Sequence, residues 1–140
     1  MTQDIINELI DGHHSLIISN AKRYVYDGHG IADLYRLLHS EPEKLRNSTV
    51  ADKVVGKAAM ALMMIGGVRE LYAHVISDLA LTLSAQSTMA VSYGRRVDHI
   101  TRHGGIGWCP MEELCRECAT ASECLYKIEE VMQTKTIGKR

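Results

Sequence analysis

Residues 48–67 have the sequence STVADKVVGKAAMALMMIGG, and this stretch decides the expected fold. Its beginning has the pattern of a helix start, because Thr49 can cap a helix and Asp52 follows three residues later. Residues 58–65 are apolar on every side, which is typical of a helix buried at the centre of a domain. Two glycines then provide a stop. We therefore predict one central helix that runs from this cap to about Ile65.

Segments on both sides of this stretch predict strands and further helices. Residues 15–19 and 23–26 are two short apolar runs separated by a turn, which predicts a β-hairpin. Similar signals predict two more strands and five more helices. The strands are expected over residues 71–76 and 89–93, and the helices over residues 4–10, 31–39, 78–84, 110–116 and 120–133.

Helices and strands therefore alternate along the chain. Such alternation favours a three-layer α-β-α domain of the α/β class around a mixed sheet. The N-terminal hairpin supplies the antiparallel edge of this sheet, and helical crossovers join the later strands. Residues 1–133 are predicted to form this single domain, and residues 134–140 a flexible C-terminal tail.

The composition narrows the range of partners. The chain has 140 residues, with 16 Lys and Arg against 17 Asp and Glu, so no basic surplus indicates a nucleic-acid partner. The N-terminus is acidic and amphipathic, unlike a signal peptide. The longest apolar run, residues 58–68, is too short to cross a membrane. We expect a cytoplasmic protein with reduced cysteines and no membrane partner.

Three segments give the chain a resemblance to a known family: DKVVGKAA (residues 52–59), YAHVIS (72–77) and CPME (109–112). With these segments the chain resembles the uncharacterised DUF1893 family, whose structural representative is a Thermotoga protein of cytidine-deaminase-like fold. The resemblance spans roughly residues 12–130. It implies a mixed sheet of strand order 2-1-3-4-5 between helical layers, in agreement with the elements predicted above. It implies a shape rather than an activity, because no function is established for the family.

The zinc ligands of cytidine deaminases are missing from the places that the resemblance assigns to them. Those enzymes need His or Cys followed by Glu two residues later at one helix start, and P-C-x-x-C at the next. Here the first place holds residues 51–57, and the second holds Ser77, Asp78 and Leu79. Zinc-dependent deamination is therefore not expected, and the fold alone does not restore it.

Lys53 and Lys57 are four residues apart, so on the predicted helix they share one face. They lie in its first two turns, where backbone N–H groups and the helix dipole favour an anion. Their mutual repulsion would be offset by a bound phosphate or carboxylate, and Asp52 could offset part of it. The alternative is a pair of solvated lysines on an otherwise buried helix.

Cys109 precedes Pro110 and is expected near the N-cap of a short helix, where the pKa of a thiol is lowered. Glu112 lies in the first turn of the same helix. Cys109 or Lys57 would be the reactive group if the protein is an enzyme, a question that the sequence leaves open. The alternative is a structural cysteine, with Glu112 serving the helix dipole.

All four cysteines lie near the C-terminus in the pattern C-x5-C-x2-C-x5-C. Cys115 and Cys118 have metal-ligand spacing, and with Cys109 and Cys124 they could hold zinc or an iron–sulfur cluster. The outer spacings match no standard site, and Cys124 falls in a helix beside Leu125, which suits packing. The alternative function is thus a non-enzymatic metal-binding or redox-sensing module.

Our leading prediction is a cytoplasmic protein of deaminase-like fold that binds an anionic small molecule, such as a nucleotide or nucleoside derivative, and needs no cofactor. A homodimer is a candidate assembly, because apolar sheet edges often pair. The residues expected to meet at the ligand are Asp52, Lys53, Lys57, Ser77, Cys109 and Glu112.

Overall fold

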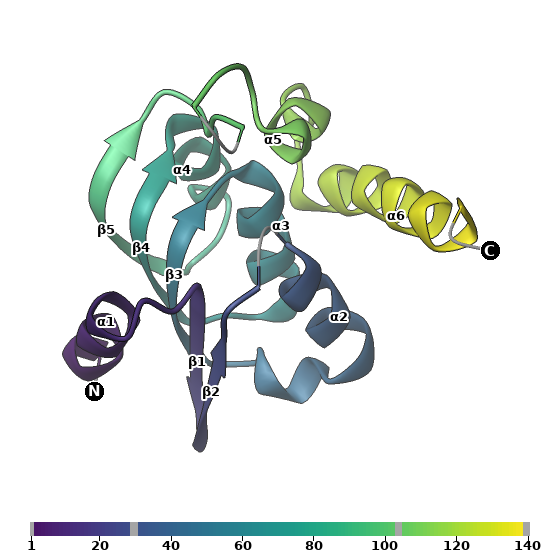
Figure 1. Cartoon of the computed structure of the whole chain (residues 1–140). Coiled ribbons are helices and arrows are strands. Elements are labelled where there is room, and N and C mark those ends of the chain that lie inside the picture. The colour runs from purple at the N-terminus through teal and green to yellow at the C-terminus, as the bar shows by residue number, and fades with distance from the viewer. Residues whose placement is uncertain (1, 29–30, 103–104, 139–140) are drawn as a thin grey trace.

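A five-stranded mixed sheet forms the centre of the fold (Figure 1). The computed structural model describes residues 2–28, 31–102 and 105–138, and the side chains of the last helix as far as Gln133. The strand order is β2-β1-β3-β4-β5, as the resemblance implied. The strands are β1 (Leu16–Asn20), β2 (Lys22–Tyr26), β3 (Thr49–Val55), β4 (Glu70–Ser77) and β5 (Ala90–Val97).

The first half of the sheet is antiparallel and the second half is parallel. The hairpin partner β1 pairs antiparallel with both β2 and β3, as the sequence predicted for the N-terminal edge. The pairs β3–β4 and β4–β5 are parallel, and each is joined by a helical crossover. The carboxyl ends of β3, β4 and β5 therefore meet at one edge of the sheet, where α/β proteins commonly bind ligands.

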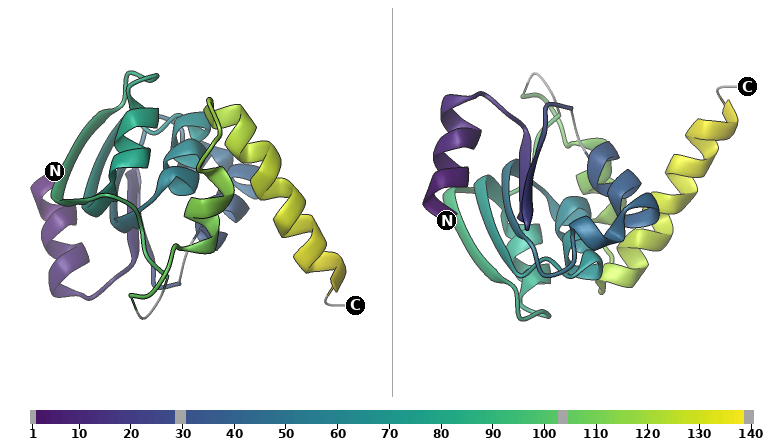
Figure 2. Two further views of the ribbon diagram at one scale, coloured as in Figure 1. Left: turned by 90° about the horizontal axis from the view of Figure 1, so that it is seen from above. Right: turned by 90° about the horizontal axis from the view of Figure 1, so that it is seen from below.

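Helices cover the two faces of the sheet unequally (Figure 2). Helix α1 (Thr2–Asp11) lies on one face of the sheet. The remaining packed helices lie on the opposite face. The predicted three-layer arrangement is confirmed. The other helices are α2 (Ala32–Ser40), α3 (Lys57–Gly66), α4 (Asp78–Ser84), α5 (Pro110–Cys115) and α6 (Ala121–Gly138), with a 3-10 turn η1 (Pro42–Lys44) after α2.

The prediction of one helix over residues 48–65 is wrong in its first half. Residues from Thr49 to Val55 form β3, and the helix begins only at Lys57. This segment contains β-branched residues, and it pairs with β1 on one side and β4 on the other, so sheet pairing outweighs the cap-like pattern. The helix ends as predicted, with Gly67 at a φ of 81° in the left-handed region.

The other element boundaries lie within two residues of the sequence prediction, with two larger differences. Strand β5 continues to Val97 instead of ending near residue 93. Helix α6 continues to Gly138, beyond the expected end near Gln133.

Helix α3 is the centre of the main core, as its apolar character predicted. Met60, Ala61, Leu62 and Met63 are fully buried. They belong to a cluster that also contains side chains of the sheet and of α2, α4 and α6. A smaller cluster of Ile5, Leu9, Ile17 and Ala51 holds α1 against the opposite face.

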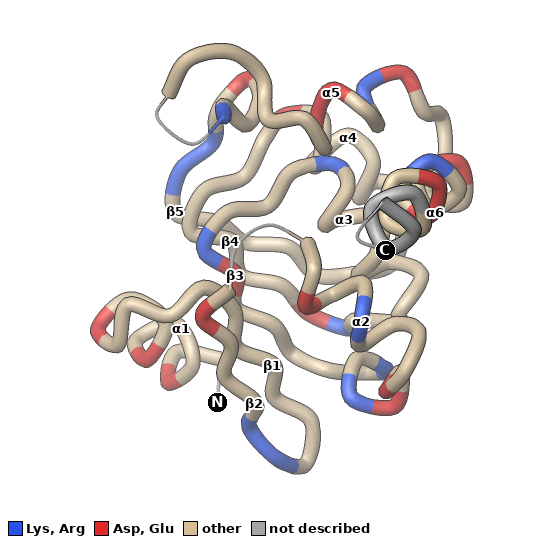
Figure 3. Tube along the Cα trace, turned by 45° about the vertical axis from the view of Figure 1, so that its right-hand side comes forward, with Lys and Arg blue, Asp and Glu red and all other residues tan. Residues whose placement is uncertain are grey.

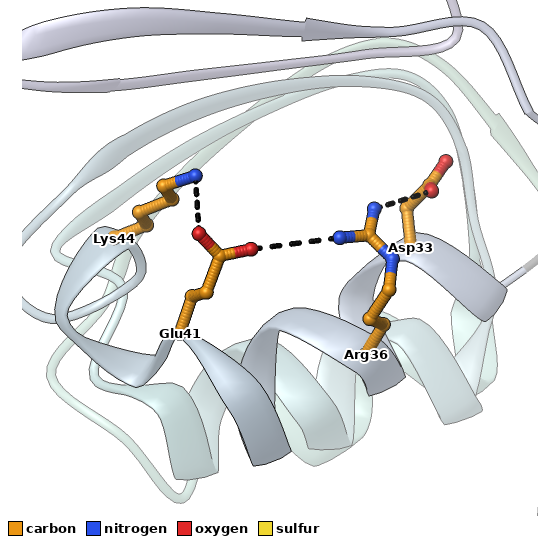
Figure 4. Close-up of polar contacts among 4 residues, drawn as sticks. All are labelled: Asp33, Arg36, Glu41 and Lys44. Atoms are coloured by element: carbon orange, nitrogen blue, oxygen red, sulfur yellow. Dashed lines mark hydrogen bonds and ion pairs between the residues drawn. The ribbon is translucent and has the colours of Figure 1, made fainter.

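A chain of ion pairs fixes the connection between α2 and η1 (Figure 4). Arg36 lies 2.9 Å from Asp33 and 3.6 Å from Glu41, and Glu41 also pairs with Lys44 at 2.6 Å. These groups are partly exposed, so each pair contributes little to stability. No helix in the described part of the chain is long and apolar enough to cross a membrane.

Candidate functional site

A pocket of about 370 Å³ lies where the carboxyl ends of the parallel strands meet the loops that follow them. Its volume falls within the range of small-molecule pockets. Lys57 at the start of α3, Asp78 at the start of α4 and Asp98 after β5 contribute to its wall. Trp108 and Arg116, on either side of α5, complete the polar and aromatic lining.

The side chain of Lys57 is buried, with only 7% of its surface exposed. Its ammonium donates hydrogen bonds to the carbonyl oxygens of Arg116 at 3.1 Å and Cys118 at 2.5 Å. These carbonyls lie just after α5, where a helix end leaves acceptors without partners and favours a cation. Lys57 therefore stabilises the end of α5 while it borders the pocket.

The Glu112 carboxylate lies at the N-terminus of α3, where the sequence predicted a bound anion. It is 99% buried, and it accepts the backbone N–H groups of Lys57 at 2.7 Å and Ile100 at 3.0 Å. It thus satisfies a free donor at the N-terminus of α3. A Cβ atom on Gly56 would lie 3.0 Å from the Glu112 Oε1 atom, so the close approach of this carboxylate favours glycine.

Together, these contacts form a brace between α3 and α5. In the first contact, the Glu112 carboxylate of α5 accepts a hydrogen bond from the backbone N–H of Lys57. In the second, the Lys57 ammonium of α3 donates hydrogen bonds to the two carbonyl oxygens that follow α5. Because each helix supplies one charged group to the other, the brace fixes the wall of the pocket.

Lys53 does not share a helix face with Lys57, so the predicted lysine pair is wrong. It is exposed on β3, and side chains of a strand follow a period of two rather than 3.6. Asp52, its neighbour, is buried and is absent from the described residues that line the pocket.

Burial raises the pKa of the Asp52 carboxyl to about 7. The backbone N–H groups of Val54 and Lys53 act in the opposite direction but only partly compensate. The Val54 hydrogen bond is long, at 3.4 Å, so it stabilises the charged carboxylate weakly. Asp52 is therefore a carboxyl that binds a proton near neutral pH.

Ser77 and Cys109 occupy helix N-cap positions. The hydroxyl of Ser77 accepts the N–H of Ala80 at 3.1 Å and caps α4. Cys109 precedes α5, as predicted, and its N–H donates to the Ile100 carbonyl at 2.9 Å. Neither is among the described residues that line the pocket. The assignment of Cys109 and Lys57 as reactive groups stays a prediction.

Sequence reasoning missed most of the pocket lining, including Asp78, Asp98, Trp108 and Arg116. The Trp108 ring stacks on His99, with centroids 4.1 Å apart and planes at 8°. The Arg116 guanidinium lies 4.5 Å from the centroid of the same ring. The one available signal was that Trp108 is the only tryptophan of the chain and lies in the glycine-rich segment before α5.

Three of the four cysteines are buried, and all four are free thiols. Burial raises the pKa of Cys118, and a hydrogen bond to Cys115 together with burial raises the pKa of Cys124. Among residues 2–28, 31–102 and 105–133, no three or more His, Cys, Asp or Glu side chains are grouped to hold a metal.

We expect one fast thiol in a labelling experiment on the folded protein. Cys109 is partly exposed, whereas the other three cysteines are covered by protein atoms. A thiol reagent such as Ellman's reagent should therefore modify Cys109 quickly, and Cys115 and Cys124 only after unfolding. Cys118 borders the pocket but is only 6% exposed, so it should react more slowly than Cys109. The Cys109→Ser variant should lose the fast phase. Fast labelling of Cys115 or Cys124 would contradict the observed packing.

The fold and the pocket define an α/β protein with a small-molecule-sized hollow at the carboxyl ends of its parallel strands. The chain belongs to the family described as Domain of unknown function (DUF1893), which matches residues 4–132. The crystal structure of a DUF1893 family protein (TM1506) from Thermotoga maritima is similar, with a TM-score of 0.83 over 91% of this chain and 87% of that chain. The sequences are 22% identical, so this similarity shows the fold. No curated protein shows significant similarity to the chain.

Proposed function

We propose that the pocket binds an anionic small molecule, such as a nucleotide or nucleoside derivative. The observation that carries this proposal is the Arg116 guanidinium, which lines a hollow of about 370 Å³ and has only a 3.8 Å contact with Glu117. Lys57, whose ammonium is held by two carbonyl oxygens, adds positive charge to the wall of the same hollow. The hollow lies at the sheet edge where ligands of α/β proteins commonly bind. Its volume suits a molecule of the size of a nucleotide.

The charges around the pocket favour an anion at Arg116. Asp78 forms an ion pair with Arg96, and Asp98 lies 2.9 Å from the Nδ1 atom of His99. Arg116 has only a long contact of 3.8 Å with Glu117, and both side chains are more than half exposed. Such a contact contributes little, so the guanidinium is available for a ligand.

The aromatic wall supports a ligand with a planar ring. One face of Trp108 is covered by His99, and the other lies under the Arg116 guanidinium. When Arg116 turns toward an anionic group, a heterocycle can replace it on the Trp108 ring, where stacking stabilises each base by about 1–3 kcal/mol. The carboxylate of Asp98 can then accept a hydrogen bond from an exocyclic amino group.

Titration with nucleoside monophosphates, nucleosides and inorganic phosphate tests the proposal. The fluorescence of Trp108, the only tryptophan, should change with a saturable dependence on the anionic ligand. The Arg116→Ala variant should bind at least about tenfold more weakly, because a hydrogen bond to a charged group contributes about 1.5–3 kcal/mol.

Arg46→Ala is the matched control, because Arg46 is an exposed arginine that does not line the pocket. It should bind as the wild type does. Equal affinity of the Arg116→Ala variant, or no saturable binding of any anionic probe by isothermal calorimetry, would refute the proposal.

A further inference from the structure

One face of the sheet is covered over only part of its width. Helix α1 packs on β1 and β3 through Ile5 and Leu9, which contact Ile17 and Ala51. Among the described residues, no other helix lies on this face, and β4 and β5 extend beyond α1 without a cover (Figure 2). Parallel strands normally have both faces covered, so this uncovered part is unusual for a complete assembly.

Contacts and burial identify the side chains of this uncovered surface. Tyr72 packs against the α1 cluster, and its hydroxyl lies 3.5 Å from the ring of His74. A Cβ atom on Gly94 would meet both side chains, which places Gly94 on the same face. Val54 is 43% exposed beside Val55, which belongs to the core on the opposite face.

The register of the parallel strands skips Lys53, His74 and Gly94, so the regular alternation of side chains is interrupted there. Alternation counted separately on each side of this interruption adds the remaining members. Val75 precedes the buried Ile76, and Arg95 precedes Arg96, which reaches α4 on the other face through Asp78. Lys53 follows Ala51 of the α1 cluster by two residues and is exposed. We call this surface the open face, and its members are Lys53, Val54, Tyr72, His74, Val75, Ser92, Gly94 and Arg95.

The open face and α1 are complementary in charge and in apolar character. The open face carries the exposed cations Lys53 and Arg95. The carboxylate at its edge, Glu70 at the start of β4, already accepts a hydrogen bond from Thr2 of α1 at 2.9 Å. Helix α1 has the sequence TQDIINELID, with three acidic residues and no basic one (Figure 3). Each surface also exposes an aliphatic side chain, Val54 on the sheet and Ile10 on the helix, each 43% exposed.

We propose that the open face binds the α1 helix of a second copy of this chain. In a two-fold symmetric dimer, each α1 would lie over β4 and β5 of the partner, beside the partner's own α1. The two helices would then complete the missing layer on both sheets. Asp11, which lies outside the Glu8–Arg23 ion pair, would meet Lys53 or Arg95, and Ile10 would pack near Val54.

Sedimentation velocity over a wide range of micromolar concentrations tests this proposal. We expect a species of twice the 15.6 kDa chain mass that dissociates as salt increases. The variants Val54→Asp and Arg95→Glu should each raise the dimer dissociation constant at least about tenfold, because they place a carboxylate against an acidic helix. Circular dichroism checks that both variants fold, as expected for exposed positions.

Two further variants make the test specific. Val25→Asp is the matched control, because Val25 is also an exposed valine of the sheet, 38% exposed, but lies on β2. It should leave the dimer unchanged. Adding Asp11→Lys to Arg95→Glu should restore part of the affinity by reversing the charge on α1.

A monomer at every concentration would overturn the proposal. A dimer whose dissociation constant is unchanged in Val54→Asp and Arg95→Glu would also overturn it. So would a dimer that the control Val25→Asp weakens as much as these two variants do. If the protein is monomeric and binds an oligonucleotide, and if Arg95→Glu abolishes this binding, the open face is a nucleic-acid surface and the dimer proposal is wrong.

Discussion

Replacing Glu112 with alanine is expected to destabilise the protein by about 2–4 kcal/mol. The variant would leave the buried N–H group of Lys57 and the partly buried N–H group of Ile100 without their acceptor. An unsatisfied buried donor costs about 1–3 kcal/mol, and two donors lose their partner here. Urea denaturation followed by circular dichroism measures the difference in the free energy of unfolding.

Glu113→Ala is the control, because Glu113 is the next residue of α5 and is exposed. It should change the free energy of unfolding by less than about 0.5 kcal/mol. Glu112→Gln should lie between the two, because an amide keeps one acceptor oxygen but loses the charge. Equal stability of Glu112→Ala and Glu113→Ala would show that the brace does not hold α3 to α5.

The sequence predicted the elements whose signals are local. Residues 58–65 are apolar on every side, and this indicated the buried helix α3 because burial follows directly from composition. Residues 49–55 were assigned to the same helix because Thr49 and Asp52 imitate a cap. Their strand conformation depends on pairing with β1 and β4, which is a property of distant segments.

The same distinction applies to the candidate site. The sequence singled out Lys57 and Glu112, since each lies near a helix start, but it did not indicate that they bind each other across 55 positions. The pocket residues Asp98, Trp108 and Arg116 come from loops that meet only when α5 packs on α3. No spacing rule connects them, so their convergence was visible only in the structure.

The Asp52→Asn substitution is expected to stabilise the protein by about 1–3 kcal/mol at pH 8. Burial raises the pKa of Asp52 from 3.8 to about 7, so at pH 8 the native state holds a charged carboxylate without a cation. Each pKa unit corresponds to about 1.4 kcal/mol. The amide has no charge to bury, although its N–H groups need partners, and this need reduces the gain.

The pH dependence of this effect has a definite sign. The raised pKa means that the native state binds a proton that the unfolded state releases between about pH 4 and pH 7. The contribution of Asp52 to stability is therefore complete below about pH 4 and is lost as the pH rises through about 7. The advantage of Asp52→Asn should thus be large at pH 8 and should shrink toward pH 5.

Comparison of the two proteins at each pH isolates Asp52 from all other titrating groups. Chemical denaturation at pH 5, 6, 7 and 8 gives the difference in the free energy of unfolding between wild type and Asp52→Asn. Asp11→Asn is the control, because Asp11 is exposed, and its difference from wild type should stay nearly constant with pH. An advantage of Asp52→Asn that grows toward low pH would mean that Asp52 is stabilised as a carboxylate, which requires a cation or strong donors that its surroundings on β3 do not supply.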